Sequence, residues 1–308
     1  TDRYVLGPPM ATVPENTNYS TSKNPAFELS YWHTGLRWAQ IWRQRLGLER
    51  ENHWDEVMEK LSQLPVQDGL YLQQEGMSNT YTGMNYEHPS LIGPGGMLPY
   101  DRADRETVRR TVAKVWDVWQ WDRCWGWDFP MMAMAAARNG RQSIAIDALL
   151  HPSTKNAMNR VGLSSGGPYP YFPANGGLLY AVALMAAGWD DAPDIPAPGF
   201  PNDGTSWKVR YEGLTPAPDS FETITGTQNA SISGSKINVY PNPARQTVSV
   251  QSDFPVKNLQ IFSLQGMNVI NGGEAKKEIN VSALPDGVYL VKIETDTDVV
   301  MQKLLIRN

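Results

Sequence analysis

Cysteine and histidine are scarce in this chain of 308 residues, which has one cysteine and four histidines. The single cysteine, Cys124, excludes an intramolecular disulfide and any zinc site built on cysteines. No second histidine stands at metal-ligand spacing from His88, so we expect no catalytic metal and no other cofactor. The lack of disulfides is compatible with export, because a large domain does not need covalent staples.

Long apolar runs and an excess of basic residues are also missing. No apolar stretch approaches the roughly 18–20 residues that a membrane-spanning helix needs. The formal net charge is −5, and the sequence has no basic stripe that could neutralise phosphates. We therefore expect no nucleic-acid partner.

Aromatic residues, by contrast, are abundant, with eleven tryptophans and thirteen tyrosines. Rings at this density suit a carbohydrate-binding cleft, although most of them are expected to fill the core. The chain is long enough for one sizeable core and a small additional module.

The additional module is the final segment, residues 237–308, which alternates apolar and polar residues at period two. Asn-Gly, Asp-Gly and proline separate the alternating runs, and this pattern predicts a small antiparallel β-sandwich. The segment opens on Val239-Tyr-Pro-Asn-Pro243 and closes on a strand with a basic end. In both respects it resembles the type A C-terminal sorting domain of the type IX secretion system of Bacteroidota. The resemblance implies that the type IX machinery binds this segment and carries the protein via the periplasm to the medium or the outer-membrane surface.

The first residues, Thr1-Asp-Arg-Tyr-Val-Leu6, contain neither an initiating methionine nor the charged start and apolar core of a signal peptide. An exported protein must first cross the inner membrane. We therefore expect this chain to be the C-terminal piece of a longer protein, with a missing N-terminal portion upstream.

Residues 1–190 have a helical pattern. Apolar residues at i, i+3 and i+4 predict six helices, at about 25–47, 52–64, 105–119, 129–137, 143–150 and 178–188. Long loops rich in glycine, proline and aromatic residues lie at 73–100, 120–128 and 164–175, and such loops are usually functional. Helix pairs with short turns on one side and long loops on the other predict half of an (α/α)6 toroid.

The expected fold class is therefore multidomain α plus β. A partial (α/α)6 toroid covers 1–190, a short β-hairpin extension 191–214, a linker 215–236 and the small antiparallel β-sandwich 237–308. The hairpin would place Trp207, Val209 and Tyr211 on one face. The linker is predicted from its threonine, serine, proline and glycine content.

Five motifs follow one another through the helical part. They are Leu6-Gly-Pro-Pro-Met-Ala-Thr-Val-Pro-Glu-Asn16, Asn24-Pro-Ala-Phe-Glu-Leu-Ser-Tyr-Trp32, Glu87-His-Pro-Ser90, Trp125-Gly-Trp-Asp-Phe-Pro130 and Tyr171-Phe-Pro-Ala-Asn-Gly-Gly177. Their order resembles the second half of the six-hairpin glycosidases, in particular the inverting α-L-fucosidases, and more distantly the maltose and trehalose phosphorylases. The resemblance implies a glycoside hydrolase that acts on carbohydrate, with its general acid at Glu15.

Three carboxylates are candidates for this chemistry. Cleavage of a glycoside needs a protonated carboxyl group at the leaving oxygen and a second carboxylate that activates water or attacks. Glu15, in a proline-rigidified loop, is the predicted acid, and Asp128 or Glu28 is the predicted second carboxylate. Asp128 is equally suited to be a helix N-cap, and Glu28 to be an ordinary first-turn acid.

Substrate contacts are expected from polar and aromatic residues of the same motifs. The tryptophans beside Asp128 could stack on sugar faces, although core filling explains them almost as well. The predicted substrate-binding residues are Asn24, Tyr31, Trp32, His88, Ser90, Trp125, Trp127, Tyr171 and Asn175.

One motif departs from the fucosidases. Their loop before the last helix carries an aspartate that helps to activate water, whereas residues 171–175 contain none. Two alternatives therefore stay open: a glycan-binding relative without turnover, and a polysaccharide lyase on the same toroid with Tyr86, His88 or Tyr169 as its base. A phosphorylase is least expected, because export removes an enzyme from cytoplasmic phosphate.

Overall fold

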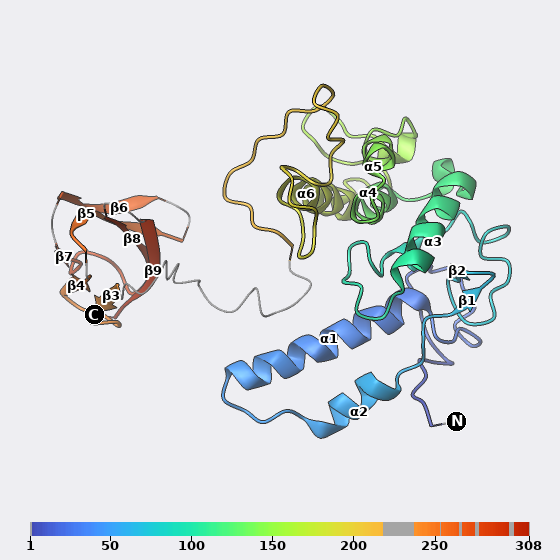
Figure 1. Ribbon diagram of the computed structural model, residues 1–308, viewed down its shortest axis with the longest axis horizontal. Coiled ribbons are helices and arrows are strands. Elements are labelled where there is room, and N and C mark those ends of the chain that lie inside the picture. The colour runs from blue at the N-terminus through green and yellow to red at the C-terminus, as the bar shows by residue number, and fades with distance from the viewer. Residues whose placement is uncertain are drawn as a thin grey trace. The chain divides into compact units, whose positions relative to one another are not determined.

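The computed structural model describes residues 2–217, 237–252, 254–264, 267–274, 277–295 and 299–307. The chain divides into two compact units, Thr1–Phe221 and Glu222–Asn308 (Figure 1). Most of the predicted linker, residues 218–236, lies outside the described residues.

The first unit contains the six predicted helices. Their bounds are α1 Ala26–Arg45, α2 Asn52–Lys60, α3 Arg105–Val118, α4 Asp128–Arg138, α5 Gln142–Leu149 and α6 Phe172–Ala187. Short elements lie between them: the β1–β2 pair (Val66–Gln67 and Leu70–Tyr71) and the 3-10 turns η1 Ser90–Ile92, η2 Trp121–Arg123 and η3 Thr154–Asn156.

Two helix boundaries differ from the prediction. Helix α2 ends at Lys60, before Leu61 turns to extended backbone. Helix α6 begins at Phe172, five residues before Gly177, so that Asn175 and both following glycines lie inside the helix and not in a loop. Pro173 explains this early start, because proline fits the first turn of a helix, where its missing N–H would have no partner.

The predicted hairpin at 191–214 is not formed, because the described residues 191–217 contain no strand. Asp203 accepts hydrogen bonds from the backbone N–H groups of Thr205 and Ser206 and holds a turn there. Trp207 packs on Phe200 with ring centroids 5.4 Å apart, and Val209 lies against the helical core. Side-chain packing, and not a ladder of backbone hydrogen bonds, therefore fixes this segment.

The core of the first unit surrounds α4, every residue of which is buried. Its alanines let neighbouring helices approach closely, and α4 packs against α3, α5 and α6. Met131, Met132 and Met134 fill the space between them together with Val112 and Met185. Each fully buried side chain of this size contributes about 1.5–3 kcal/mol through the hydrophobic effect.

Two helices carry apolar side chains that the described residues leave exposed. Helix α6 has no polar face, yet Leu179 is 73% and Phe172 62% exposed. On α1, Tyr31 and Trp32 are more than half exposed, and Trp42 is half exposed. A helix that is apolar all round is typical of a buried position, so these faces are candidates for contact with further protein.

The second unit is built from two antiparallel sheets. One has the strand order β3-β4-β7 and the other β6-β5-β8-β9. The bounds are β3 Asn238–Tyr240, β4 Thr247–Gln251, β5 Val256–Ser263, β6 Asn268–Glu274, β7 Glu278–Asn280, β8 Gly287–Thr295 and β9 Val299–Ile306.

Alternation along these strands places one face of each sheet in a shared core, as the period-two pattern predicts. Val248 and Val250 come from the first sheet, and Leu259, Val291 and Leu304 from the second. The side-chain amide of Gln302 bridges the sheets: it donates to the carbonyl of Ile237 at 2.6 Å and accepts from the N–H of Val239 at 3.1 Å.

Candidate functional site

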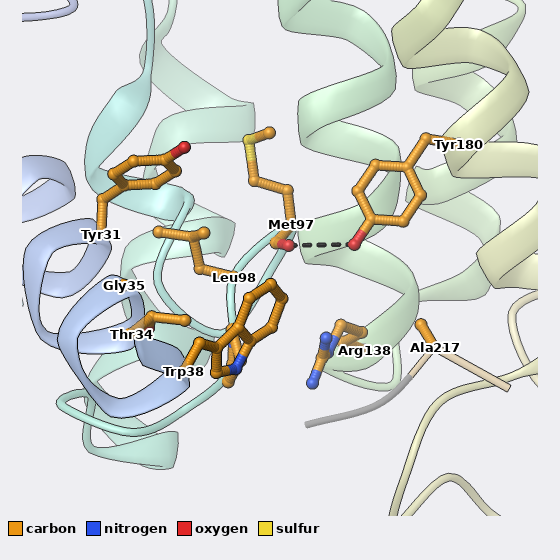
Figure 2. A pocket seen from close by; sticks show the side chains of 10 residues that line it. Tyr31, Thr34, Gly35, Trp38, Met97, Leu98, Arg138, Tyr180 and Ala217 are labelled. Carbon is orange, nitrogen blue, oxygen red and sulfur yellow. Dashed lines mark hydrogen bonds between the residues drawn. The ribbon is translucent and has the colours of Figure 1, made fainter. Parts of the chain in front are cut away.

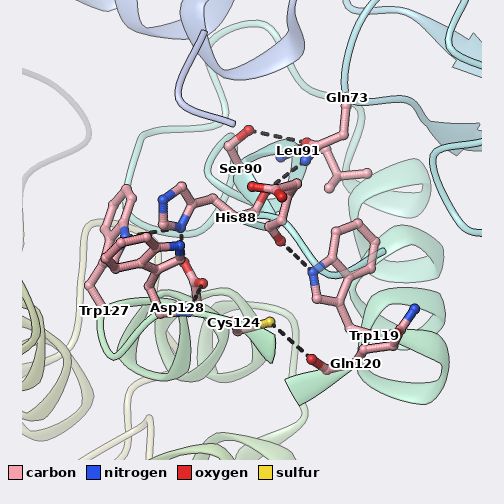
Figure 3. A network of polar contacts seen from close by, with 11 residues as sticks. Gln73, His88, Ser90, Leu91, Trp119, Gln120, Cys124, Trp127 and Asp128 are labelled. Atoms are coloured by element: carbon pink, nitrogen blue, oxygen red, sulfur yellow. Dashed lines mark hydrogen bonds and ion pairs between the residues drawn. The ribbon is translucent and has the colours of Figure 1, made fainter. Parts of the chain in front are cut away.

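Four loops of the helical unit meet at the N-terminal ends of α4 and α6. They are residues 12–16, 85–90, 124–128 and 164–171, and hydrogen bonds or ring contacts join each to another. Figure 3 shows the polar network in which the second and third of these loops converge. The site is therefore made of segments that are far apart in the sequence.

A buried imidazole–carboxylate pair lies at the centre of this network. Nδ1 of His88 is 2.8 Å from Oδ1 of Asp128, whose exposure is 0% (Figure 3). The other carboxylate oxygen, Oδ2, accepts the backbone N–H of Trp125 at 2.8 Å. Burial raises the pKa of Asp128, while the imidazole of His88 and the N–H of Trp125 oppose this rise. Asp128 thus closes the turn that leads from Trp125 into α4 and holds His88 at the same time.

The loop that carries His88 is fixed by a second buried side chain, that of Gln73. Its amide Nε2 donates to the carbonyl of His88 at 2.6 Å. Its Oε1 accepts from both the hydroxyl of Ser90 and the N–H of Leu91, each at 3.1 Å. Ser90 is 1% exposed, so the structure uses this predicted substrate ligand to support the loop.

Glu15 stands at the open side of the site. It is exposed, and its neighbour Asn16 donates to Oε1 of the buried Glu87 at 2.5 Å. Glu15 also acts on Tyr171: burial, followed by the negative charges of Asp128 and Glu15, raises the pKa of the Tyr171 phenol to about 12. Two of the predicted carboxylates, Glu15 and Asp128, are therefore close to one tyrosine.

The third predicted carboxylate, Glu28, lies behind the loop that carries Glu15. It is 9% exposed, and its Oε1 accepts the backbone N–H of Val13 at 2.6 Å. Its other oxygen is buried with no hydrogen-bond partner among the described residues. Burial is the main cause of the raised pKa of this carboxyl, and the bond from Val13 opposes it. Glu28 therefore anchors the loop that carries Glu15 to helix α1.

Aromatic rings form one wall of the site. The ring of Trp125 lies 5.9 Å from that of His88 and 5.7 Å from that of Tyr171, between centroids. Trp127 packs on His88 at 4.9 Å, and Lys155 lies over the ring of Trp125 at 5.9 Å. The partly exposed rings of Trp125, Trp127 and Tyr171 offer large apolar faces for contact with a ligand.

The backbone beneath Trp125 is packed too tightly for side chains. The N–H of Gly126 donates to the carbonyl of Gly166 at 2.9 Å. A Cβ on Gly166 would lie 2.1 Å from the carbonyl oxygen of Lys155 and 2.5 Å from Cα of Gly126. Glycine is thus required at position 166 for the 164–171 and 124–128 loops to approach each other this closely. Their contact positions Trp125, which precedes Gly126.

The structure places three predicted ligands, Asn24, Tyr31 and Trp32, outside this cluster, and uses a fourth, Asn175, to support one of its loops. Asn24, 1% exposed, accepts from the N–H of Leu6 and donates to Glu75. Asn175 ties the 162–164 loop to α6 through bonds to Gly162 and Ser164. Tyr31 and Trp32 lie along α1, and Tyr31 stacks on Phe27 with centroids 5.7 Å apart.

Tyr31 belongs instead to a separate apolar pocket with a volume of about 170 Å³. Figure 2 shows Tyr31 and Trp38 of α1 on one side and Tyr180 of α6 on the other, with Met97 between them. The hydroxyl of Tyr180 donates to the carbonyl of Met97 at 3.1 Å. The pocket therefore lies between the same two helices whose apolar side chains are exposed.

Sequence reasoning missed three residues that organise the site: Asn16, Gln73 and Glu87. Asn16 and Glu87 belong to two of the motifs, where they flank the predicted residues Glu15 and His88. The sequence does not indicate that their side chains form a hydrogen bond with each other. Gln73 lies outside every motif. A buried glutamine is a signal only once its neighbours in space are known.

The C-terminal unit has a recognised counterpart. Residues 238–307 match the family described as secretion system C-terminal sorting domain. This match confirms the sorting tail predicted from the period-two strands. The tail directs export by the type IX secretion system, so the protein is secreted or displayed at the cell surface. A search of curated proteins finds no match for this chain.

Two further features of the described residues bear on the site. They contain no group of three or more histidine, cysteine, aspartate or glutamate side chains that could hold a metal ion. Within the same residues, no helix has the length and apolar character needed to cross a membrane. The prediction that catalysis needs no metal or cofactor stays a prediction.

Proposed function

We propose that the helical unit is the catalytic part of an exported glycoside hydrolase that cleaves glycosidic bonds in complex glycans. The observation that carries this proposal is the position of Glu15. Glu15 is exposed and close enough to Tyr171 to raise the pKa of its phenol, and the Tyr171 ring contacts that of Trp125. The neighbouring Asn16 is bonded to Glu87, which precedes His88 of the buried His–Asp pair. Glycoside hydrolysis needs such an acid at the edge of a site where a sugar ring can stack.

In this proposal Glu15 protonates the leaving oxygen. Trp125 and Tyr171 hold the sugar, and water attacks from the side of His88 and Asp128. The tethers of the Glu15 loop to Glu28 and Glu87 support this role, because an acid must be held in place relative to the bond that it protonates.

We further propose that the six helices belong to an (α/α)6 toroid, in which additional helices of the same protein pack on the apolar faces of α1 and α6. The exposed side chains Leu179 and Trp42 and the aromatic pocket beside Tyr31 support this arrangement. Burial of a large aromatic or aliphatic side chain contributes about 1.5–3 kcal/mol, so the pairing would be strongly stabilising.

A polysaccharide lyase is the second candidate, favoured by the imidazole of His88, which lies between the rings of Trp125 and Trp127. Tyr171, whose pKa is raised to about 12, is poorly suited to lose its proton. Among the bases expected from the sequence, Tyr86, His88 and Tyr169, His88 is the one held by a buried carboxylate, and it would be the base of the lyase. An unsaturated product that absorbs in the near ultraviolet would identify this reaction.

The test is a substrate screen of the native protein, captured by an antibody to its sorting domain, on 4-nitrophenyl glycosides and oligosaccharides. Glu15→Gln is expected to lower kcat by a factor on the order of 10²–10⁴ and to leave glycan binding intact. Glu59→Gln, at an exposed position of α2, is the matched control. Unchanged turnover in Glu15→Gln overturns the assignment of the acid. Glycan binding without turnover in the wild type supports the non-catalytic alternative.

A further inference from the structure

We infer that Nε2 of His88 is the atom that accepts a proton from the attacking water, and that Asp128 is a positioning residue for this imidazole. This inference rests on the proposed hydrolase function. It moves the base from the carboxylate that the sequence suggests to the histidine that this carboxylate holds.

Asp128 is not placed to act on water directly. Its side chain is 0% exposed, and each oxygen has a protein partner: His88 for Oδ1 and the N–H of Trp125 for Oδ2. Its complete burial keeps both oxygens away from solvent water. A buried carboxylate that faces an imidazole nitrogen is the arrangement by which one tautomer of histidine is selected.

The tautomer follows from a competition at Nδ1. This nitrogen lies 2.8 Å from Oδ1 of Asp128 and 3.1 Å from Nε1 of Trp127 (Figure 3). It carries either a proton for Asp128 or a lone pair for the indole N–H, but not both. The contact with Asp128 is shorter, and a bond to a carboxylate is the stronger of the two. Nδ1 therefore carries the proton, and Nε2 carries the lone pair.

Nε2 is free to take up a proton. Among the described residues, Nε2 has no hydrogen-bond partner. It is also not one of the fully buried side-chain atoms that lack a partner, so this nitrogen is accessible from the site. The rings of Trp125 and Trp127 flank the imidazole. The charged and titratable groups around it are Asp128, Glu87 of its own loop, Glu15 and Tyr171 on the far side of Trp125, and Lys155 over that ring.

The step balances without a further reactant. The oxygen of water forms a bond to the anomeric carbon while the glycosidic carbon–oxygen bond breaks. The proton of water moves to Nε2 of His88, and the proton of Glu15 moves to the leaving oxygen. The imidazolium is stabilised by Asp128, and its proton returns to Glu15 through solvent to complete the cycle.

The first experiment reads the tautomer and does not depend on activity. The full chain is labelled with ¹⁵N-histidine, and the imidazole nitrogens are observed by NMR, with His88→Gln identifying the signal of His88. The expected result is that the neutral imidazole is the Nδ1–H tautomer, with the lone pair on Nε2. A protonated Nε2 with unprotonated Nδ1 overturns the proposal.

Asp128→Asn sharpens this test. The amide oxygen must face the N–H of Trp125, which turns the NH₂ group toward His88. An NH₂ donor at that position requires a lone pair on Nδ1 and so moves the proton to Nε2. The tautomer is expected to reverse in Asp128→Asn and to stay unchanged in the control Asp122→Asn, an exposed residue of η2.

The second experiment uses turnover on the glycoside that the screen identifies. His88→Ala and Asp128→Asn are each expected to lower kcat by a factor on the order of 10²–10⁴, with a smaller change in KM. Added imidazole is expected to restore part of the turnover to His88→Ala only. The control His53→Gln, 65% exposed in its side chain, is expected to keep full turnover.

The outcomes separate this inference from the proposed function. Turnover by the wild type that persists in His88→Ala overturns the role of His88 and leaves the hydrolase standing. Absence of wild-type turnover on every glycan overturns the hydrolase, whereas the NMR result still reports whether Asp128 selects the tautomer.

Discussion

The side-chain amide of Asn16 donates a hydrogen bond to Oε1 of Glu87 at 2.5 Å. Asn16 follows Glu15 in the chain, and Glu87 precedes His88. One hydrogen bond therefore ties the loop of Glu15 to the loop of His88, although 71 residues separate the two partners in the sequence.

Removal of this bond is expected to loosen the site without touching its chemistry. Asn16→Ala leaves the buried carboxylate of Glu87 without this donor, which costs about 1–3 kcal/mol of unfolding free energy. Asn16→Asp places a second carboxylate beside Glu87 and is expected to cost more than Asn16→Ala, because the two negative charges repel each other. Thermal unfolding at pH 7 measures the effect, and hydrogen exchange of residues 12–16 locates it. Equal stability of the three proteins would show that the bond does not hold the loop.

Glu28 is expected to make stability depend on pH. Burial raises its pKa, so the native state binds this proton more tightly than the unfolded chain does. Its contribution to the free energy of unfolding is therefore full below the ordinary pKa of a glutamate and is lost as the pH rises through the folded pKa. The raised pKa of Asp128 acts in the same direction.

Glu28→Gln removes one of these two titrations and keeps an acceptor for the N–H of Val13. The fall in Tm between pH 4 and pH 8 is expected to be smaller in this variant than in the wild type, by about 2 °C or more. Glu59→Gln, at an exposed position, serves as control. Parallel pH curves for all three proteins would contradict the prediction.

The sorting tail is expected to need its folded core for export. Val291 is 0% exposed, so Val291→Asp buries a charge between the sheets and unfolds the tail. Met301 is 37% exposed, and Met301→Gln is expected to leave the fold intact. Fractionation with an antibody to the helical unit should find Val291→Asp in the periplasm and Met301→Gln in the medium or on the surface. Normal export of Val291→Asp would mean that a linear signal suffices.

The elements that sequence reasoning predicted best are those with a local cause. The strand β8 follows from Pro285-Asp-Gly287 and from an alternation that continues through Ile293, and the match to a sorting-domain family confirms this module. The helices follow from apolar spacing. The start of α6 was misplaced because glycines 176 and 177 look like a loop, whereas Pro173 had already begun the helix.

The site was predictable only where motif order carried information. Glu15, His88, Asp128, Trp125 and Tyr171 do come together, but their roles depend on contacts that no pattern contains. Asp128 is covered by His88, and Glu28 lies under Val13. Asn24 stands in a predicted motif and yet adopts a left-handed backbone, φ 46°, with its side chain bonded to Leu6 and Glu75. The type of a residue indicates which reactions its side chain can take part in, whereas its burial and hydrogen bonds decide which of its atoms can reach a substrate.

Position 166 shows how such a protein could change its function without losing any residue of the proposed chemistry. A single methyl group there would push the Lys155 backbone and Gly126 apart and carry Trp125 with them. Relatives that keep Glu15, His88, Asp128 and the aromatic rings but carry alanine at this position would then lose the proposed activity, although every residue of the proposed chemistry is present. A comparison limited to the residues of the proposed chemistry would count such relatives as active. The residue at position 166 should therefore be compared first, although glycine takes no part in the chemistry.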